Sequence, residues 1–124
     1  MTAADVKTQL RGVLGFPVTP FRQDLKLDLE ALACNVDRMA QHAFCALVAA
    51  GGTGEMYSLA VDEIGEVVRT TVEVVRKRMA VIAGVGFNTP IAVALARRLE
   101  SAGADALLVM PPYYTNAPHE GLYD

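Results

Sequence analysis

Long apolar runs are missing from this chain of 124 residues, and so is any excess of positive charge. No apolar stretch reaches the roughly 18 residues that a membrane-spanning helix needs, and the first residues lack the charged and apolar regions of a signal peptide. The net charge is −3, and the basic side chains form no patch of the kind that binds nucleic acid. These absences predict a cytoplasmic protein that acts neither in a membrane nor on nucleic acid.

Metal-binding patterns are scarce as well. The two cysteines, Cys34 and Cys45, have neither CxxC spacing nor histidine partners, and the two histidines, His42 and His119, stand far apart in the chain. We therefore expect no metal site and no bound cofactor. Both cysteines are expected to be small buried hydrophobic side chains.

What the chain has in quantity is apolar residues. They make up 52% of the sequence, and the mean hydropathy of +0.29 is high for one small domain. No linker, repeat or shift of composition divides the sequence, so residues 1–124 are expected to form one domain. The high apolar content predicts that some apolar surface stays uncovered.

Four apolar runs have the length of strands, and none of them alternates apolar with polar residues. Continuous runs of this kind are typical of parallel sheets that are buried on both faces. The runs are Val13 to Phe16, Cys45 to Ala50, Ala80 to Ala83, and Ala106 to Met110.

Segments with helical periodicity lie between these runs. The first follows a candidate N-cap at Asp28 and extends to Ala40, and the third opens at Thr89 as N-cap with Gly103 just past its end. On the third helix we expect Ile91, Ala94, Leu95, Leu99 and Ala102 to share one face. The middle segment, Asp62 to Met79, is rich in valine, but the spacing of its apolar residues favours a helix: Ile64, Val67, Val68, Thr71 and Val75.

Strands and helices therefore alternate, with a fourth helix expected to open near His119. Such repeats build right-handed βαβ units and a parallel sheet. Four units correspond to half of an eight-stranded barrel or to most of a small doubly wound sheet, and periodicity does not separate the two. In both, ligands bind at the carboxyl ends of the strands.

The most informative of these strand ends is the loop from Gly51 to Glu55, because its backbone amides and one hydroxyl can face an anion. Thr53 either binds a substrate carboxylate or closes the turn through its hydroxyl. Glu55 is either a general base or, as we favour, a carboxylate held by backbone amides. Neither this loop nor Gly84 to Asn88 completes the glycine pattern of a dinucleotide site.

The last strand end carries Tyr113 and Tyr114 after two prolines, and a phenol placed there is either a packing aromatic or a proton shuttle. Taken together, several motifs resemble the dihydrodipicolinate synthase and N-acetylneuraminate lyase superfamily. They are Gly12 to Phe21, Gly51 to Glu55, Ala83 to Gly86, Gly103 to Ala106, Pro111 to Tyr114, and Glu120 to Tyr123. Within it, Phe16 to Thr19, Gly52 and Pro111 resemble the branch of the 5-dehydro-4-deoxyglucarate dehydratases.

The resemblance implies a (β/α)₈ TIM barrel in which a lysine forms a Schiff base with the 2-oxo group of a sugar acid. It implies that Gly52, Thr53 and Gly54 bind the substrate carboxylate and that Thr53 and Tyr114 take part in catalysis. The partner would be a small-molecule 2-oxo sugar acid, which loses water and carbon dioxide to give 2,5-dioxopentanoate. A homo-oligomer is a possible assembly, as in the full-length relatives. Tyr114 departs from the dehydratase branch, where leucine is expected, and matches the synthases.

The family's catalytic lysine has no counterpart here. The three lysines are Lys7 ahead of the first strand, Lys26 in a loop and Lys77 at a helix end, and none is expected to be buried at the carboxyl end of a strand. We therefore expect the amino-terminal half of such a lyase, inactive by itself. The alternatives are a dihydrodipicolinate synthase or another 2-oxo acid aldolase of the superfamily, a half-barrel that binds or assembles without catalysis, and a small nucleotide-binding protein.

Overall fold

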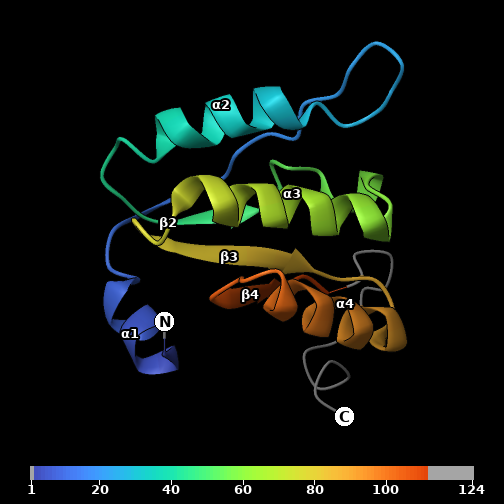
Figure 1. Cartoon of the computed structure of the whole chain (residues 1–124). Helices are drawn as coiled ribbons and strands as arrows, with labels where there is room; N and C mark the ends of the chain where they lie inside the picture. The colour runs from blue at the N-terminus through green and yellow to red at the C-terminus, as the bar shows by residue number, and fades with distance from the viewer. Residues whose placement is uncertain (1, 112–124) are drawn as a thin grey trace.

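The structure, a computed structural model, describes residues 2–111. Its four strands form one parallel sheet in the order β1-β2-β3-β4, so each strand pairs with its predecessor in the sequence (Figure 1). The elements are α1 (Ala3–Gln9), β1 (Val13–Gly15), α2 (Leu29–Met39), β2 (Phe44–Ala49), the 3₁₀ turn η1 (Met56–Ser58), α3 (Val61–Val75), β3 (Ala80–Val85), α4 (Thr89–Ser101) and β4 (Ala106–Val109). The predicted order of strands and helices is confirmed.

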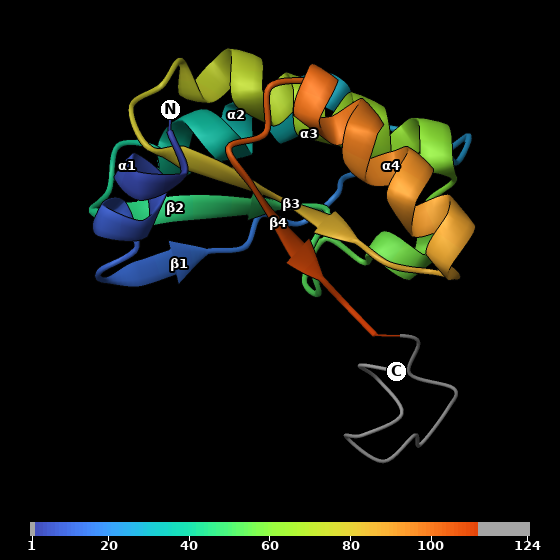
Figure 2. The same cartoon turned by 90° about the horizontal axis from the view of Figure 1, so that it is seen from below.

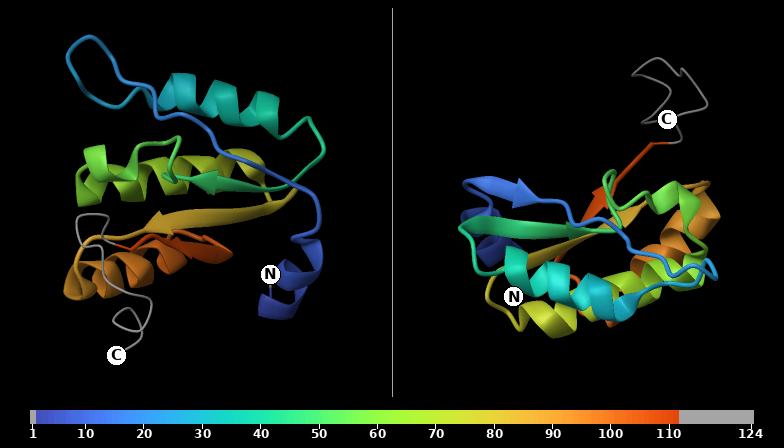
Figure 3. Two further views of the ribbon diagram at one scale, coloured as in Figure 1. Left: turned by 180° about the vertical axis from the view of Figure 1, so that it is seen from behind. Right: turned by 90° about the horizontal axis from the view of Figure 1, so that it is seen from above.

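The helices α2, α3 and α4 all lie on the same side of a curved sheet, as Figure 2 and the right view of Figure 3 show. Right-handed crossovers that always step to the next strand in one direction place every helix on one face. A doubly wound sheet instead reverses its strand order and carries helices on both faces. The arrangement is therefore that of the first half of a (β/α)₈ barrel, which decides between the two architectures.

The larger core lies between the sheet and the three helices. Each large aliphatic side chain buried there contributes about 1.5–3 kcal/mol relative to exposure. The fully buried members include Leu32, Val36, Leu47, Ile64, Val67, Val68, Val75, Leu95 and Leu99. A smaller cluster of Ala46, Val48, Ala80 and Ile82 lies on the other face of the sheet, with Phe16 and Leu108 packed against it.

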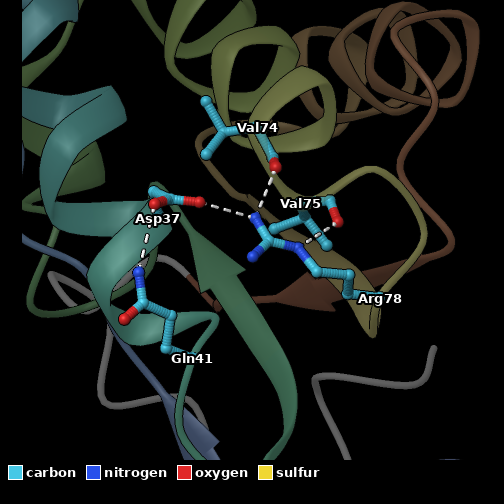
Figure 4. Close-up of polar contacts among 5 residues, drawn as sticks. All are labelled: Asp37, Gln41, Val74, Val75 and Arg78. Carbon is cyan, nitrogen blue, oxygen red and sulfur yellow. Dashed lines mark hydrogen bonds and ion pairs between the residues drawn. The ribbon is translucent and has the colours of Figure 1, made fainter.

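The valine-rich helix α3 confirms that apolar spacing outweighs the local strand preference of valine. Every residue expected on its inner face is buried: Ile64, Val67, Val68, Thr71 and Val75. At its end the Arg78 guanidinium donates to the carbonyl oxygens of Val74 and Val75 at 2.8 and 3.1 Å, and to Asp37 of α2 at 2.8 Å (Figure 4). Arg78 therefore satisfies terminal carbonyls of α3 and links it to α2.

Several local expectations were wrong. Asn88, not Thr89, caps α4, because the Asn88 side chain accepts a hydrogen bond from the amide of Ile91. Ile91 and Ala94 are exposed, whereas Leu95 and Leu99 are buried. Cys34 is exposed because it lies on the outer face of α2. Gly103 does follow the end of α4, at a φ of +96° that favours glycine.

The sequence interpretation also missed helix α1, which lies beside the amino ends of the strands (Figure 1). Its signal was the Thr2-x-x-Asp5 pattern. The Thr2 hydroxyl accepts the Asp5 amide at 3.2 Å, and the Asp5 carboxylate accepts the Thr2 amide at 2.9 Å. This reciprocal pair is a capping box.

Apolar surface does remain exposed in the described part of the chain, as the composition predicted. It includes residues on the two outer strands, where Val13 of β1 is 63% exposed and Val109 of β4 is 68% exposed. Among residues 2–111, none of the helices combines the length and the apolarity that crossing a bilayer requires.

Candidate functional site

The site is built on the loop that follows β2, from Ala50 to Glu55. Ala50 and Glu55 both adopt left-handed backbone conformations, with φ of 47° and 53°. The Glu55 amide donates to the Gly52 carbonyl at 3.0 Å, and the Met56 amide donates to the Gly51 carbonyl at 3.3 Å. The chain therefore turns sharply at the end of β2 and closes the loop with its own backbone.

Neighbouring strand ends hold this loop on both sides. From the segment after β1, the Thr19 hydroxyl donates to the Gly54 carbonyl at 2.8 Å. From β3, Gly84 leaves room for the Ala50 carbonyl, which occupies the place of a side chain. Gly54 itself is buried against the backbone of Ala50. The loop is thus fixed before any ligand arrives.

The part of the loop that faces solvent is Gly52 and Thr53, which are both exposed. Within residues 2–111, no backbone acceptor takes the amide of either residue, so both amides and the Thr53 hydroxyl are available to a ligand. A turn that presents successive amides is suited to a carboxylate or phosphate group. The only ionisable side chain of the loop is that of Glu55, which is exposed and caps no backbone amide of η1. The expectation that backbone amides hold this carboxylate was wrong.

Tyr57 connects the loop to the other strand ends and was not identified from the sequence. Its hydroxyl lies 3.2 Å from the Met110 carbonyl oxygen and 3.1 Å from that of Pro111. Its ring meets the edge of Phe87, just after β3, with the centroids 5.2 Å apart. The carboxyl ends of β2, β3 and β4 therefore meet around Tyr57.

The structure describes only some of the candidate residues that the sequence predicted. The structure places Gly52, Thr53 and Gly54 together in the loop, whereas Tyr113, Tyr114 and the helix expected near His119 lie outside the described residues. All three lysines are exposed: Lys7 on α1, Lys26 in the segment between β1 and α2, and Lys77 after α3. In the part of the chain that the structure describes, no three His, Cys, Asp or Glu residues cluster as a metal site would require.

Similar sequences come from bacteria. The chain is 47% identical to a probable 5-dehydro-4-deoxyglucarate dehydratase of Bradyrhizobium sp. strain BTAi1, over 90% of this chain and 36% of that relative. It is 43% identical to a protein of the same name from Rhizobium meliloti strain 1021, over 99% of this chain and 41% of that relative. The chain thus spans about two fifths of the length of these curated relatives.

Solved structures agree in fold. A dihydrodipicolinate synthase from Agrobacterium tumefaciens matches with a TM-score of 0.87 and 33% identity, over 96% of this chain and 40% of that one. A chloride-inhibited dihydrodipicolinate synthase from Acinetobacter baumannii was solved in complex with pyruvate. It matches with a TM-score of 0.85 and 33% identity, over 92% of this chain and 40% of that one. The family model of the dihydrodipicolinate synthetases matches residues 9–124. The chain therefore belongs to the dihydrodipicolinate synthetase family.

Proposed function

We propose that residues 1–124 are the amino-terminal part of a Schiff-base lyase that acts on a 2-oxo sugar acid. The observation that carries the proposal is the fixed loop after β2, in which the exposed amides of Gly52 and Thr53 can bind a carboxylate. Gly54 supports them from its buried position. The Acinetobacter relative was solved with pyruvate, a small 2-oxo acid, which supports a 2-oxo carboxylate as the group bound.

The reaction we propose is that of a 5-dehydro-4-deoxyglucarate dehydratase, a hydro-lyase that releases water and carbon dioxide and forms 2,5-dioxopentanoate. The names of the Bradyrhizobium and Rhizobium relatives, at 47% and 43% identity, support this choice over a synthase. In such chemistry an iminium at the 2-oxo carbon accepts the electron pair of the bond that breaks. The amides of the loop would hold the carboxylate next to that carbon and so orient it.

The attacking amine would have to be a lysine that is partly desolvated, because burial lowers the pKa of an amine and leaves it uncharged. Lys7, Lys26 and Lys77 are all exposed and do not meet this requirement. We therefore propose that these 124 residues alone form no Schiff base. Thr53 and Tyr114 are proposed to relay protons in the whole enzyme.

The first experiment measures the intact mass of the protein as produced from its own gene, after incubation with pyruvate and reduction with borohydride. The expected result is a stable pyruvate adduct on a chain with a mass above the 13.3 kDa of these 124 residues. The Thr53→Val variant of that protein should give the adduct more slowly at low pyruvate, because the loop loses its hydroxyl donor. A 13.3 kDa chain that turns over a 2-oxo sugar acid would overturn the proposal.

Carboxylate binding is testable in the 124-residue chain without turnover. Titration with pyruvate, followed by amide NMR, should shift the signals of Gly52, Thr53 and Gly54 before others. Acetone at the same concentration is the control, because it has the oxo group of pyruvate but no carboxylate. Shifts spread evenly over the chain would count against the assignment of the loop.

A second candidate function is binding or assembly by a half-barrel, favoured by the exposed Val13 and Val109 on the two outer strands. Uncovered strand edges tend to pair with other chains. Sedimentation of the 124-residue chain tests this function. A monodisperse monomer would exclude pairing between copies, whereas a defined dimer would support it.

A further inference from the structure

We propose that Tyr57 is a positioning residue whose hydroxyl ties the end of β4 to the loop that carries Gly52 and Thr53. The hydroxyl has one proton and two carbonyl oxygens within reach, that of Met110 at 3.2 Å and that of Pro111 at 3.1 Å. In the sequence, these two residues come shortly before Tyr113 and Tyr114. A hydrogen bond at this point fixes where the chain leaves β4.

The Tyr57 side chain extends from the loop after β2 past the end of β3 to the segment after β4, and the residue that follows β3 leaves room for it. A Cβ atom on Gly86 would lie 2.8 Å from the Tyr57 hydroxyl oxygen, 3.2 Å from the ring carbon that bears it and 2.5 Å from the Met56 methyl group. Glycine at this position therefore leaves the space that the Tyr57 hydroxyl and the Met56 methyl group occupy.

The ring of Tyr57 is held as well as its hydroxyl. It meets Phe87 edge to face, with an angle of 77° between the ring planes. Next to this contact, the Met110 amide donates to the Val85 carbonyl at 2.7 Å and extends the pairing of β3 with β4. Tyr57 thus joins three consecutive strand ends by two different kinds of contact.

The consequence for activity rests on the proposed function. If Gly52 and Thr53 hold the carboxylate, the tie sets the distance between the bound substrate and the groups that follow β4. Tyr57 itself need not touch the substrate, because its hydroxyl is engaged with the backbone of β4. It would then affect the chemical step more than the binding of the carboxylate.

The structural part is tested by amide hydrogen exchange in the 124-residue chain. Tyr57→Phe keeps the ring and removes the hydroxyl, so exchange of the Met110 amide should accelerate about two- to tenfold. Thr19→Val is the matched control, because it removes a hydroxyl on the β1 side of the same loop. It should accelerate exchange at Glu55 and leave Met110 within about twofold. Unchanged exchange of the Met110 amide in Tyr57→Phe would show that the Tyr57 hydroxyl does not hold the end of β4 and would overturn the proposal.

The functional part is tested in the protein as produced from its own gene. Tyr57→Phe should lower kcat about two- to tenfold and leave KM within about twofold, since the carboxylate loop stays whole. A rise in KM with unchanged kcat would show that Tyr57 only supports the loop and would overturn the positioning role. If the wild-type protein forms no adduct with pyruvate, the proposed function fails, and hydrogen exchange still decides whether the tie exists.

Discussion

The carbonyl oxygen of Ala50 occupies the space that a side chain at Gly84 would need. A Cβ atom built on Gly84 would overlap this oxygen and would lie 2.9 Å from the carbonyl carbon of Ala50. Both partners are backbone, so neither can swing away as a flexible side chain would. The sharp turn after β2 therefore depends on a missing side chain in the neighbouring strand.

Gly84→Ala should destabilise the chain by about 1–3 kcal/mol, because the added methyl group forces the backbone of β2 and β3 apart. Urea unfolding followed by circular dichroism measures the change. The matched control is Gly52→Ala, since nothing lies within 4 Å of a Cβ atom built at Gly52. That variant should change the free energy of unfolding by less than about 0.5 kcal/mol. Equal effects of the two substitutions would contradict the steric argument.

The hydroxyl of Thr19 should contribute about 1 kcal/mol to stability through its bond to the Gly54 carbonyl. Thr19→Val keeps the shape of the side chain but leaves that carbonyl without its donor. Thr19→Ser retains the hydroxyl and should recover most of the loss. The comparison is made by urea unfolding of the three proteins, and a Ser variant no better than the Val variant would point to packing of the methyl group instead.

The stability of the chain should depend on pH through Asp37. The hydrogen bond from Arg78 lowers the pKa of the Asp37 carboxyl below its ordinary value of 3.8, with a smaller contribution from Gln41. A carboxyl whose pKa is lowered by folding stabilises the folded state above its unfolded pKa, and this stabilisation is lost as the pH falls through the folded pKa.

Asp37→Asn tests this dependence, because the amide oxygen can still accept a hydrogen bond but carries no charge. The urea midpoint of the wild type should exceed that of the variant at pH 7, and the difference should shrink as the pH falls below about 4. High salt should also reduce it at pH 7, since both side chains are partly exposed. A difference that stays constant down to pH 2 would exclude the charge as its cause.

The two cysteines should react with a thiol reagent at different rates. Cys34 is exposed on α2, whereas Cys45 is half-buried at the start of β2 with its sulfur 3.4 Å from the Val13 carbonyl oxygen. Absorbance after addition of Ellman's reagent should show a fast and a slow phase of equal size. Cys34→Ser should remove the fast phase, and loss of the slow phase instead would reverse the assignment.

Most of the architecture could be predicted from the sequence because apolar spacing reports burial directly. The inner face of α3 is an example, since its valines and Ile64 recur at helical intervals although each valine by itself favours a strand. The choice between barrel and doubly wound sheet did not follow from spacing. It depends on the direction of each crossover, which the order of strands in the sheet reveals.

The site was predicted only in part for a similar reason. Gly52 and Thr53 belong to a continuous motif, so their place in one loop could be read from the sequence. The Tyr57 hydroxyl contacts carbonyl oxygens of residues more than fifty positions further along the chain, and no local sequence pattern predicts such a contact. Cys34 was misplaced because its residue type usually favours burial, whereas its position on α2 faces outward.

The order of the strands also bears on how the chain folds while it is being synthesised. Each new strand pairs with the strand made just before it, and α2 and α3 pack side by side as consecutive helices. Each of these pairings spans a single βα unit, and synthesis delivers the chain from its amino terminus. Each βα unit that leaves the ribosome therefore meets a docking edge that is already formed, so the sheet can grow one strand at a time in the direction of translation.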